Sequence, residues 1–183
     1  MRIASKACVA ASSVLLIASA AHAANRWWDG TNTGGTGNGA SDGGTATWDT
    51  AALNWDQGNG SARVAWVNGN NDTAIFAGTS GAVSLGAAIT VGGLQFDTAS
   101  YTIQSNTLTF GVAGSIVANQ NATISSVIAG SAAIAKSGSG TLTFSGTNTY
   151  TGGTTIGAGT LQAGGTRAFN NTSALSMTSG SGT

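Results

Sequence analysis

The segment from Ser137 to Gly165, SGSGTLTFSGTNTYTGGTTIGAGTLQAGG, consists almost entirely of Gly, Thr and Ser, with an apolar residue every few positions. A globular core needs more bulk than this, so the backbone must be held by pairing with neighbouring strands. Within the segment, GTLTF at Gly140 to Phe144 returns as GTLQA at Gly159 to Ala163, 19 residues later. A repeat of about 20 residues, with three short strands and three turns, is typical of one coil of a parallel β-helix.

Short strands are predicted along the rest of the chain as well. The runs ITVGGLQF, YTIQ and TLTF alternate apolar and polar residues, which indicates strands with one buried face, and Gly, Asn and Ser separate them as turns. We expect one stacked register through the apolar residues Leu94, Leu108, Ile124, Leu142 and Leu161. The predicted fold class is all-β, a parallel β-helix. An antiparallel β-sandwich is the alternative, because turn signals every 8–12 residues also suit it.

The first 23 residues have the pattern of a signal peptide. Arg2 and Lys6 form a positive start, and a short apolar run follows. Ala21-His22-Ala23 has the A-x-A form of a cleavage site, which predicts that the exported chain begins at Ala24. The apolar run is too short for a membrane-spanning helix.

Removal of the signal peptide changes the available chemistry. Cys8 and His22 are lost, so the exported chain contains no Cys, His or Glu, and four basic residues face six Asp. Disulfides, Cys or His nucleophiles and zinc sites built from Cys and His are thereby excluded. The balanced charge offers no basic surface for nucleic acid. We therefore predict no nucleic-acid partner.

A repeated Trp-Asp pair is the main candidate for a ligand site. Trp48-Asp49 and Trp55-Asp56 could form a glycan contact, in which the indoles stack on sugar rings and the carboxylates accept hydrogen bonds from hydroxyls. The alternative is that the Trp residues cover the apolar end of the first coil. We favour this cap, because all the Trp residues lie near the N-terminus: Trp27, Trp28, Trp48, Trp55 and Trp66.

Enzymatic and metal-binding interpretations are weaker. Two Asp are the minimum for a glycosidase, yet Asp in Gly- and Asn-rich turns usually accepts local backbone hydrogen bonds. NGNNDTAIFAG, around Asp72, resembles a calcium-binding nonapeptide, but its Gly spacing fails and there are no tandem copies. We therefore predict a chain that is not an enzyme, with no catalytic residue, cofactor or metal.

The stretch from Lys136 to Gly164 resembles the passenger-associated strand repeat of bacterial autotransporters, also called the autotransporter-associated β-strand repeat. The match covers KSGSGTLTFSGTNTYTGGTTIGAGTLQAG, with Phe144 where Leu is usual, and the similarity extends upstream to Trp48. The resemblance implies a right-handed parallel β-helix, exported through the inner membrane to the cell surface, outer membrane or medium. It also implies a partner, an outer-membrane translocator barrel, either in the same gene product or missing here.

These observations predict four regions. Residues 1–23 are the signal peptide, and 24–80 form a Trp-rich N-terminal cap with the first strands. Residues 81–165 form β-helix coils, including the strand repeat 136–165, and 166–183 form a C-terminal tail that we interpret as a truncation. The favoured function is a non-enzymatic passenger stalk that supports secretion and surface display. The alternative is an adhesin that binds glycan or a host protein through the Trp-rich end or a lateral ladder.

Overall fold

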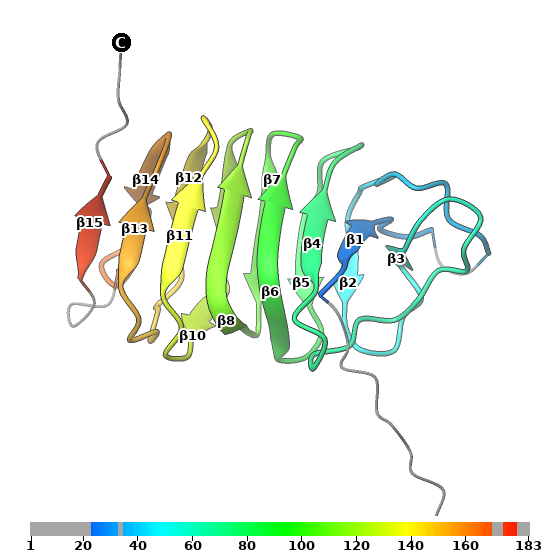
Figure 1. Ribbon diagram of the computed structural model, residues 1–183, viewed down its shortest axis with the longest axis horizontal. Coiled ribbons are helices and arrows are strands. Elements are labelled where there is room, and N and C mark those ends of the chain that lie inside the picture. Colours follow the sequence, from blue (N-terminus) through cyan, green and yellow to red (C-terminus); the bar gives the residue numbers. More distant parts are fainter. Residues whose placement is uncertain (1–22, 33–34, 170–173, 179–183) are drawn as a thin grey trace, which may run out of the picture.

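The computed structural model describes residues 23–32, 35–169 and 174–178. The predicted signal peptide, including Ala21, lies outside the described residues except for Ala23. The regular elements in these ranges are β-strands (Figure 1). No helix in the described part of the chain is long and apolar enough to cross a membrane.

The strands stack along the long axis of the molecule in two sheets that face each other across a narrow interior (Figure 1). The first sheet consists, in spatial order, of β15 (Leu175–Met177), β13 (Thr154–Ile156), β11 (Ile134–Ser137), β8 (Thr107–Ala118), β6 (Ile89–Phe96), β4 (Thr73–Phe76), β1 (Asn25–Trp28) and β3 (Trp55–Asp56), with β10 (Val127–Ala129) beside β8. The second consists of β14 (Thr160–Ala163), β12 (Thr141–Phe144), β9 (Ala122–Ile124), β7 (Tyr101–Ser105), β5 (Ala82–Leu85) and β2 (Ala46–Trp48).

Successive coils pair in parallel. Thr73 lies beside Gly93, and Gly93 beside Ser115, so one coil takes about 20 residues. In the second sheet Leu142 lies beside Leu161, as the 19-residue repeat predicts. The parallel β-helix is confirmed. The antiparallel sandwich is wrong, and the antiparallel pairing of named strands in the described chain is confined to β1 with β3.

Each coil contains up to three strand segments, two of which merge in the middle coils. The start of β8 pairs with β10 and its second half with β11. The register of β6 with β8 shifts between Val91 and Gly93, which marks a bulge where the two segments join. The long strands β6 and β8 therefore each consist of two segments, which lie on two faces of the coil and join at a bend.

The predicted common register of the apolar residues is only partly correct. Leu142 and Leu161 are partners, but Ile124 pairs with Phe144. Leu94 and Leu108 lie in the other sheet, where Leu94 pairs with Ile116. Both sheets present the same alternation of apolar and polar residues, so equal pattern does not identify the sheet to which a strand belongs.

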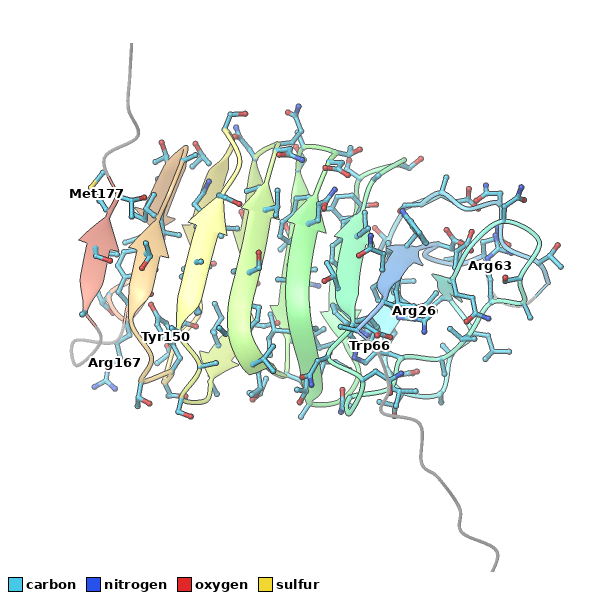
Figure 2. All side chains as sticks on the ribbon, viewed as in Figure 1. Arg26, Arg63, Trp66, Tyr150, Arg167 and Met177 are labelled. Carbon is cyan, nitrogen blue, oxygen red and sulfur yellow. The ribbon has the colours of Figure 1, made fainter. Side chains whose placement is uncertain are left out.

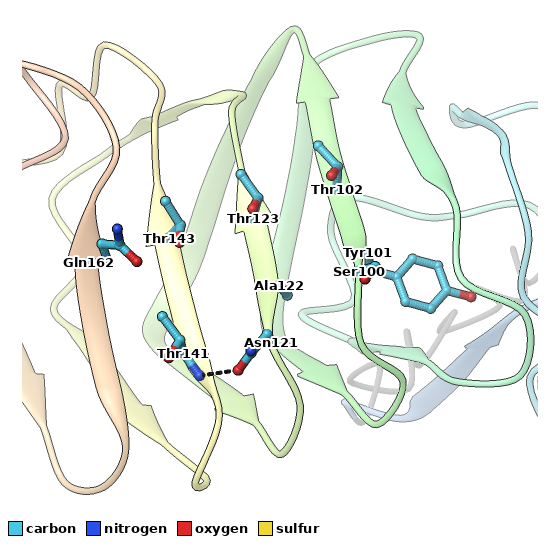
Figure 3. A pocket seen from close by; sticks show the side chains of 9 residues that line it. All are labelled: Ser100, Tyr101, Thr102, Asn121, Ala122, Thr123, Thr141, Thr143 and Gln162. Atoms are coloured by element: carbon cyan, nitrogen blue, oxygen red, sulfur yellow. Dashed lines mark hydrogen bonds between the residues drawn. The ribbon is translucent and has the colours of Figure 1, made fainter.

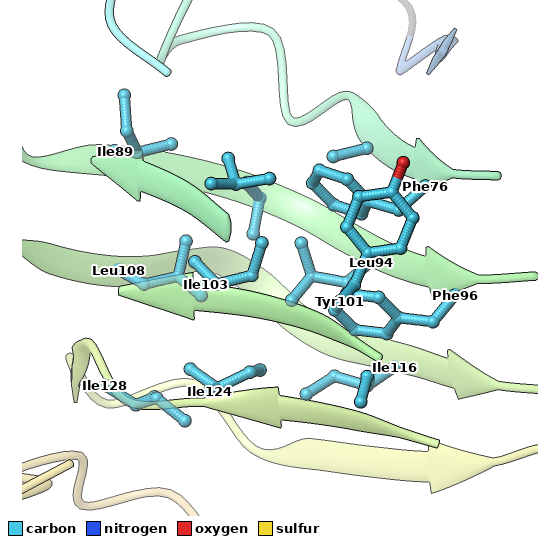
Figure 4. Packing of buried hydrophobic residues seen from close by; sticks show 14 of the residues in the cluster. Phe76, Ile89, Leu94, Phe96, Tyr101, Ile103, Leu108, Ile116, Ile124 and Ile128 are labelled. Atoms are coloured by element: carbon cyan, nitrogen blue, oxygen red, sulfur yellow. The ribbon is translucent and has the colours of Figure 1, made fainter. Parts of the chain in front are cut away.

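The core is a continuous column of inward-pointing side chains (Figure 4). Phe76 stacks on Phe96 in the next coil, with ring centroids 5.3 Å apart and planes 16° apart. Ile103 and Ile124 occupy paired positions on the opposite sheet and are fully buried. Because each coil contributes a few large residues to the same narrow column, a chain rich in Gly and Thr still builds a packed interior.

Candidate functional site

Four Trp side chains form one buried cluster at the N-terminal end of the coil stack. The ring centroids of Trp48 and Trp55 are 4.8 Å apart, those of Trp48 and Trp66 4.9 Å, and those of Trp28 and Trp55 5.1 Å. Trp28 Nε1 donates a hydrogen bond to the Gly44 carbonyl at 2.9 Å. All four indoles are at most 2% exposed. The cluster is part of the hydrophobic core.

The predicted glycan contact does not agree with this burial. Trp48, Trp55 and Asp56 are 0% exposed, so no ring face or carboxylate is available to a sugar. The Asp56 carboxylate accepts hydrogen bonds from the backbone of Gly39 and Gly58. A glycan contact requires exposed side chains, and Trp48, Trp55 and Asp56 are buried.

Asp49, the fourth residue of that predicted contact, is half-buried. Its Oδ1 accepts hydrogen bonds from the backbone nitrogens of Ala51 and Ala52, at 2.8 and 2.7 Å. This is the local turn role weighed against catalysis for these Asp residues. The Asp49 carboxylate thus stabilises its own loop, while the Asp56 carboxylate also joins its loop to the one that contains Gly39.

A second cluster in the N-terminal loops is ionic. Arg63 Nε lies 2.5 Å from Asp29 Oδ2, and Arg63 Nη2 lies 3.3 Å from Asp42 Oδ2. The hydrogen bond with Asp29 raises the pKa of Arg63, while burial raises the pKa of the Asp29 carboxyl. Asp29 and Arg63 are 34 residues apart, and no local pattern in the sequence indicates their pairing. The cluster ties two loops together.

Lys136 is a cation inside the coil stack. It is 1% exposed and occupies an inward position between Ile116 and Ile156 of the neighbouring coils. Its ammonium donates hydrogen bonds to the carbonyls of Ser137, Gly138 and Ala158, at 3.1, 2.9 and 2.9 Å. Burial lowers the pKa of this ammonium. Since Ala158 lies in the next coil, Lys136 links two coils at a corner.

Asn148 also links neighbouring coils, at another corner. It is 4% exposed, and its Oδ1 accepts a hydrogen bond from Ile128 N at 2.8 Å. Its Nδ2 donates to the carbonyl of Ala168 at 2.6 Å. Ile128 and Ala168 belong to the coils on either side, so one buried amide bridges three coils. These bonds satisfy backbone groups that would otherwise be buried unpaired.

The outer face of the second sheet carries a row of polar side chains that we call the hydroxyl ladder. Thr102 pairs with Thr123, Thr123 with Thr143, and Thr143 with Gln162, so the four side chains lie in adjacent parallel strands (Figure 3). Adjacent strands are about 4.8 Å apart, which sets the spacing of the row. No residue of β5, β7, β9, β12 or β14 is charged.

A shallow depression of about 490 Å³ lies over this ladder. Asn121 Oδ1 accepts a hydrogen bond from the backbone of Thr141 at its edge, at 2.8 Å (Figure 3). Hydroxyl and amide groups both donate and accept hydrogen bonds, so this surface suits an uncharged polar ligand. The residues around it are Ser100, Tyr101, Thr102, Asn121, Ala122, Thr123, Thr141, Thr143 and Gln162.

Comparison with known proteins places this architecture in a class. The family described as passenger-associated-transport-repeat matches residues 134–163. The chain is also 38% identical over 133 residues to a protein named adhesin BmaC autotransporter from Brucella suis biovar 1 (strain 1330). The aligned part is 70% of this chain but 4% of that relative, so the chain spans a small fraction of its length. No solved structure matches.

Fold and comparison together define a β-solenoid of the passenger type. The matched repeat runs from β11 to β14 and therefore includes one complete turn of the stack, from β11 to its partner β13. The predicted resemblance is confirmed: residues 134–163 carry the passenger-associated transport repeat, and the chain is similar to an autotransporter adhesin.

Proposed function

We propose that the chain is a non-enzymatic stalk segment, which supports secretion across the outer membrane and displays the passenger on the cell surface. The observation that carries the proposal is the place of the repeat in the fold. Residues 134–163 contain β11 and β12 and the strands that follow one coil later, and β11 pairs in parallel with β13 while β12 pairs in parallel with β14. The repeat is thus a stacking unit.

A stacking unit is suited to secretion in an extended form. Each coil contacts only its neighbours, so a coil that has crossed the membrane can fold onto the coil already outside. The partner in this process is a translocator barrel in the full gene product. Residues 24–183 contain no Cys, so no disulfide within them obstructs an extended chain in a narrow pore.

Display on a living cell tests the stalk function. We suggest fusing the full chain ahead of an autotransporter translocator barrel and measuring the protease-accessible protein on the cell surface. Leu142→Asp, which buries a charge in the repeat, should lower surface display severalfold, whereas Thr143→Asp on the outer face should not. Equal display of both variants would contradict a role for the folded repeat in secretion.

We also propose that the Trp-rich region 24–80 caps the N-terminal end of the stack. The centroids of Trp48 and Trp55 lie 5.8 and 5.9 Å from that of Phe76, which stacks on the next coil through Phe96. The Trp cluster therefore covers the ring at the start of the column. Arg63, which pairs with Asp29, lies in the loops beyond the cluster (Figure 2). A solenoid with an uncovered apolar end would associate with other molecules.

The hydroxyl ladder supports a second function, adhesion through the side of the stalk. The depression over Thr102, Thr123 and Thr143 is lined by uncharged polar groups, which suit a neutral glycan. A glycan array probed with the full chain tests this function. Thr123→Arg should abolish any bound signal, and Thr155→Arg on the outer side of the first sheet is the matched control. Binding that survives Thr123→Arg would exclude the ladder as the site.

A further inference from the structure

Ala24, the predicted first residue of the exported chain, is held by a buried carboxylate. Its backbone nitrogen donates a hydrogen bond to Asp72 Oδ1 at 2.8 Å. Its carbonyl accepts a hydrogen bond from Thr73 N at 2.9 Å, which continues into the parallel pairing of β1 with β4. The Asp72 side chain is 3% exposed, and its Oδ2 is bound by Arg26 Nε at 2.9 Å.

The exposure of the chain changes at the predicted cleavage point. Ala23 is exposed, whereas Ala24 is half-buried. The bond between them therefore lies where a peptidase can reach it while the residue after it already contacts the folded protein. Arg26, the cation that shares Asp72, lies at the N-terminal end of the molecule with Trp66 (Figure 2).

Cleavage changes the chemistry of this contact. Hydrolysis breaks the bond from the Ala23 carbonyl carbon to Ala24 N; the water oxygen becomes part of the Ala23 carboxylate. The Ala24 nitrogen leaves as an amine, which is protonated near neutral pH. An amide N–H donor thereby becomes an ammonium, and its hydrogen bond to a carboxylate becomes charge-assisted on both sides. The bond to the carboxylate thereby gains the attraction between two opposite charges.

We propose that Asp72 is the binding site for the mature N-terminus, so that removal of the signal peptide locks β1 onto β4. The N-terminal ammonium and Arg26 each take one oxygen of Asp72. Trp28, four residues after Ala24, belongs to the Trp cluster, so this anchor holds the end of the strand that enters the cluster. Processing is thereby coupled to the stability of the N-terminal end of the solenoid.

Thermal unfolding of the full chain, before and after treatment with purified leader peptidase, tests the proposal. Mass spectrometry should identify Ala24 as the new first residue. Cleavage should raise the midpoint of the wild-type protein by about 2–4 °C, which corresponds to about 1 kcal/mol in a chain of this size. Asp72→Asn, which keeps a hydrogen-bond acceptor without the charge, should remove this rise. Asp97→Asn, at an exposed carboxylate, should keep it. An equal rise in wild type and Asp72→Asn, or none in wild type, would overturn the proposal.

Acetylation provides a second measurement on the wild-type protein, which does not depend on the folding of Asp72→Asn. After cleavage the chain has two amines, at Ala24 and at the buried Lys136. Acetylation confined by peptide mapping to Ala24 restores a neutral N–H and should return the midpoint to that of the uncleaved chain. An acetylated sample that keeps the full rise would also overturn the proposal.

Discussion

Leu142 lies directly beside Leu161 in the parallel pair of β12 and β14, and both pack against the core. Leu142 is 0% exposed, whereas Thr143, the next residue, is on the outer face. Leu142→Asp places a carboxylate between apolar neighbours and should reduce the free energy of unfolding by more than about 3 kcal/mol. Thr143→Asp should change it by less than about 1 kcal/mol. Urea unfolding followed by circular dichroism measures both values.

The damage from Leu142→Asp should also be local, because each coil contacts only its neighbours. Hydrogen exchange should accelerate in β9, β12 and β14, while β4 keeps its protection. Uniform acceleration along the whole stack would show instead that the solenoid unfolds as a single unit.

The pairing of Leu142 with Leu161 was predictable because the two strands repeat almost the same letters at a fixed distance. The positions of Leu94 and Leu108 were not, since coil length varies and one strand segment merges with the next at the bulge after Val91. Alternation determines which residues face inward. Alternation does not determine which sheet a strand joins. An insertion at a corner between strands leaves the alternation within each strand intact but shifts its pairing register with the next coil.

The alternating pattern of the sequence indicates the inward position of Lys136. In the run Ile134-Ala135-Lys136 the alternation that buries Ile134 also points Lys136 inward, yet a charged residue is ordinarily expected outside. Three carbonyls from two coils make the interior site acceptable. Sequence reasoning could not find those carbonyls, because they meet only when the coils stack.

Replacement of Lys136 by Met should destabilise the protein near pH 7. Met keeps the apolar length, but the carbonyls of Ser137, Gly138 and Ala158 lose their donor, at a cost of about 1–3 kcal/mol. Urea unfolding measures the difference. Lys136→Arg, which keeps the donors in a bulkier group, should destabilise for a different reason, overpacking between Ile116 and Ile156.

The Lys136 ammonium should also make the stability of the wild type depend on pH. Its pKa in the folded protein is lowered by burial, so in the window between that pKa and the ordinary value of 10.5 the unfolded chain binds more protons. Stability of the wild type relative to Lys136→Met should therefore rise as pH rises through this window. A relative stability that falls with pH would contradict the burial of the ammonium.

Gly159 should be essential to the corner between β13 and β14. Its φ is +67°, and a Cβ there would lie 2.4 Å from the Gly138 carbonyl oxygen of the previous coil. Gly159→Ala should lower the free energy of unfolding by about 2 kcal/mol or more, through strain and this clash. Gly157→Ala, whose Cβ would meet no atom closer than 3.5 Å, is the matched control. Equal unfolding midpoints for the two variants would contradict this corner geometry.

The Trp-Asp pairs show why the candidate glycan site could not be decided from the sequence. Trp and Asp are suitable for binding sugars, and the same residues are suitable for a core and for turns. Burial separates these alternatives, and it depends on the fold, which packs Trp28 against Trp55 and Trp66 against Trp48. The hydroxyl ladder was equally hidden, since Thr102, Thr123 and Thr143 become one row only when three coils are in register.

Deprotonation of Tyr101 should contribute to the loss of stability at alkaline pH. Its hydroxyl oxygen lies 2.7 Å from the carbonyl oxygens of both Ala77 and Thr79, which share its one proton, and burial raises its pKa to about 12. The unfolded chain loses this proton near pH 10, so the folded state binds more protons between pH 10 and about 12, and stability falls as pH rises through that window.

Absorbance at 295 nm reports this titration directly, because the chain has two Tyr, and burial also raises the pKa of the other, Tyr150. In the folded protein both phenols should ionise above pH 10, and in urea both should ionise near 10. Tyr101→Phe should remove the transition at about 12 and weaken the alkaline decline in unfolding free energy. At neutral pH it should cost about 0.5–1.5 kcal/mol, the net contribution of a lost hydrogen bond, because the carbonyls of Ala77 and Thr79 keep Ser41 and Gly44 as donors. If both phenols of the folded protein ionised near 10, Tyr101 would have to be open to solvent, and the hydrogen bonds that join it to the strand end at Ala77 would be excluded.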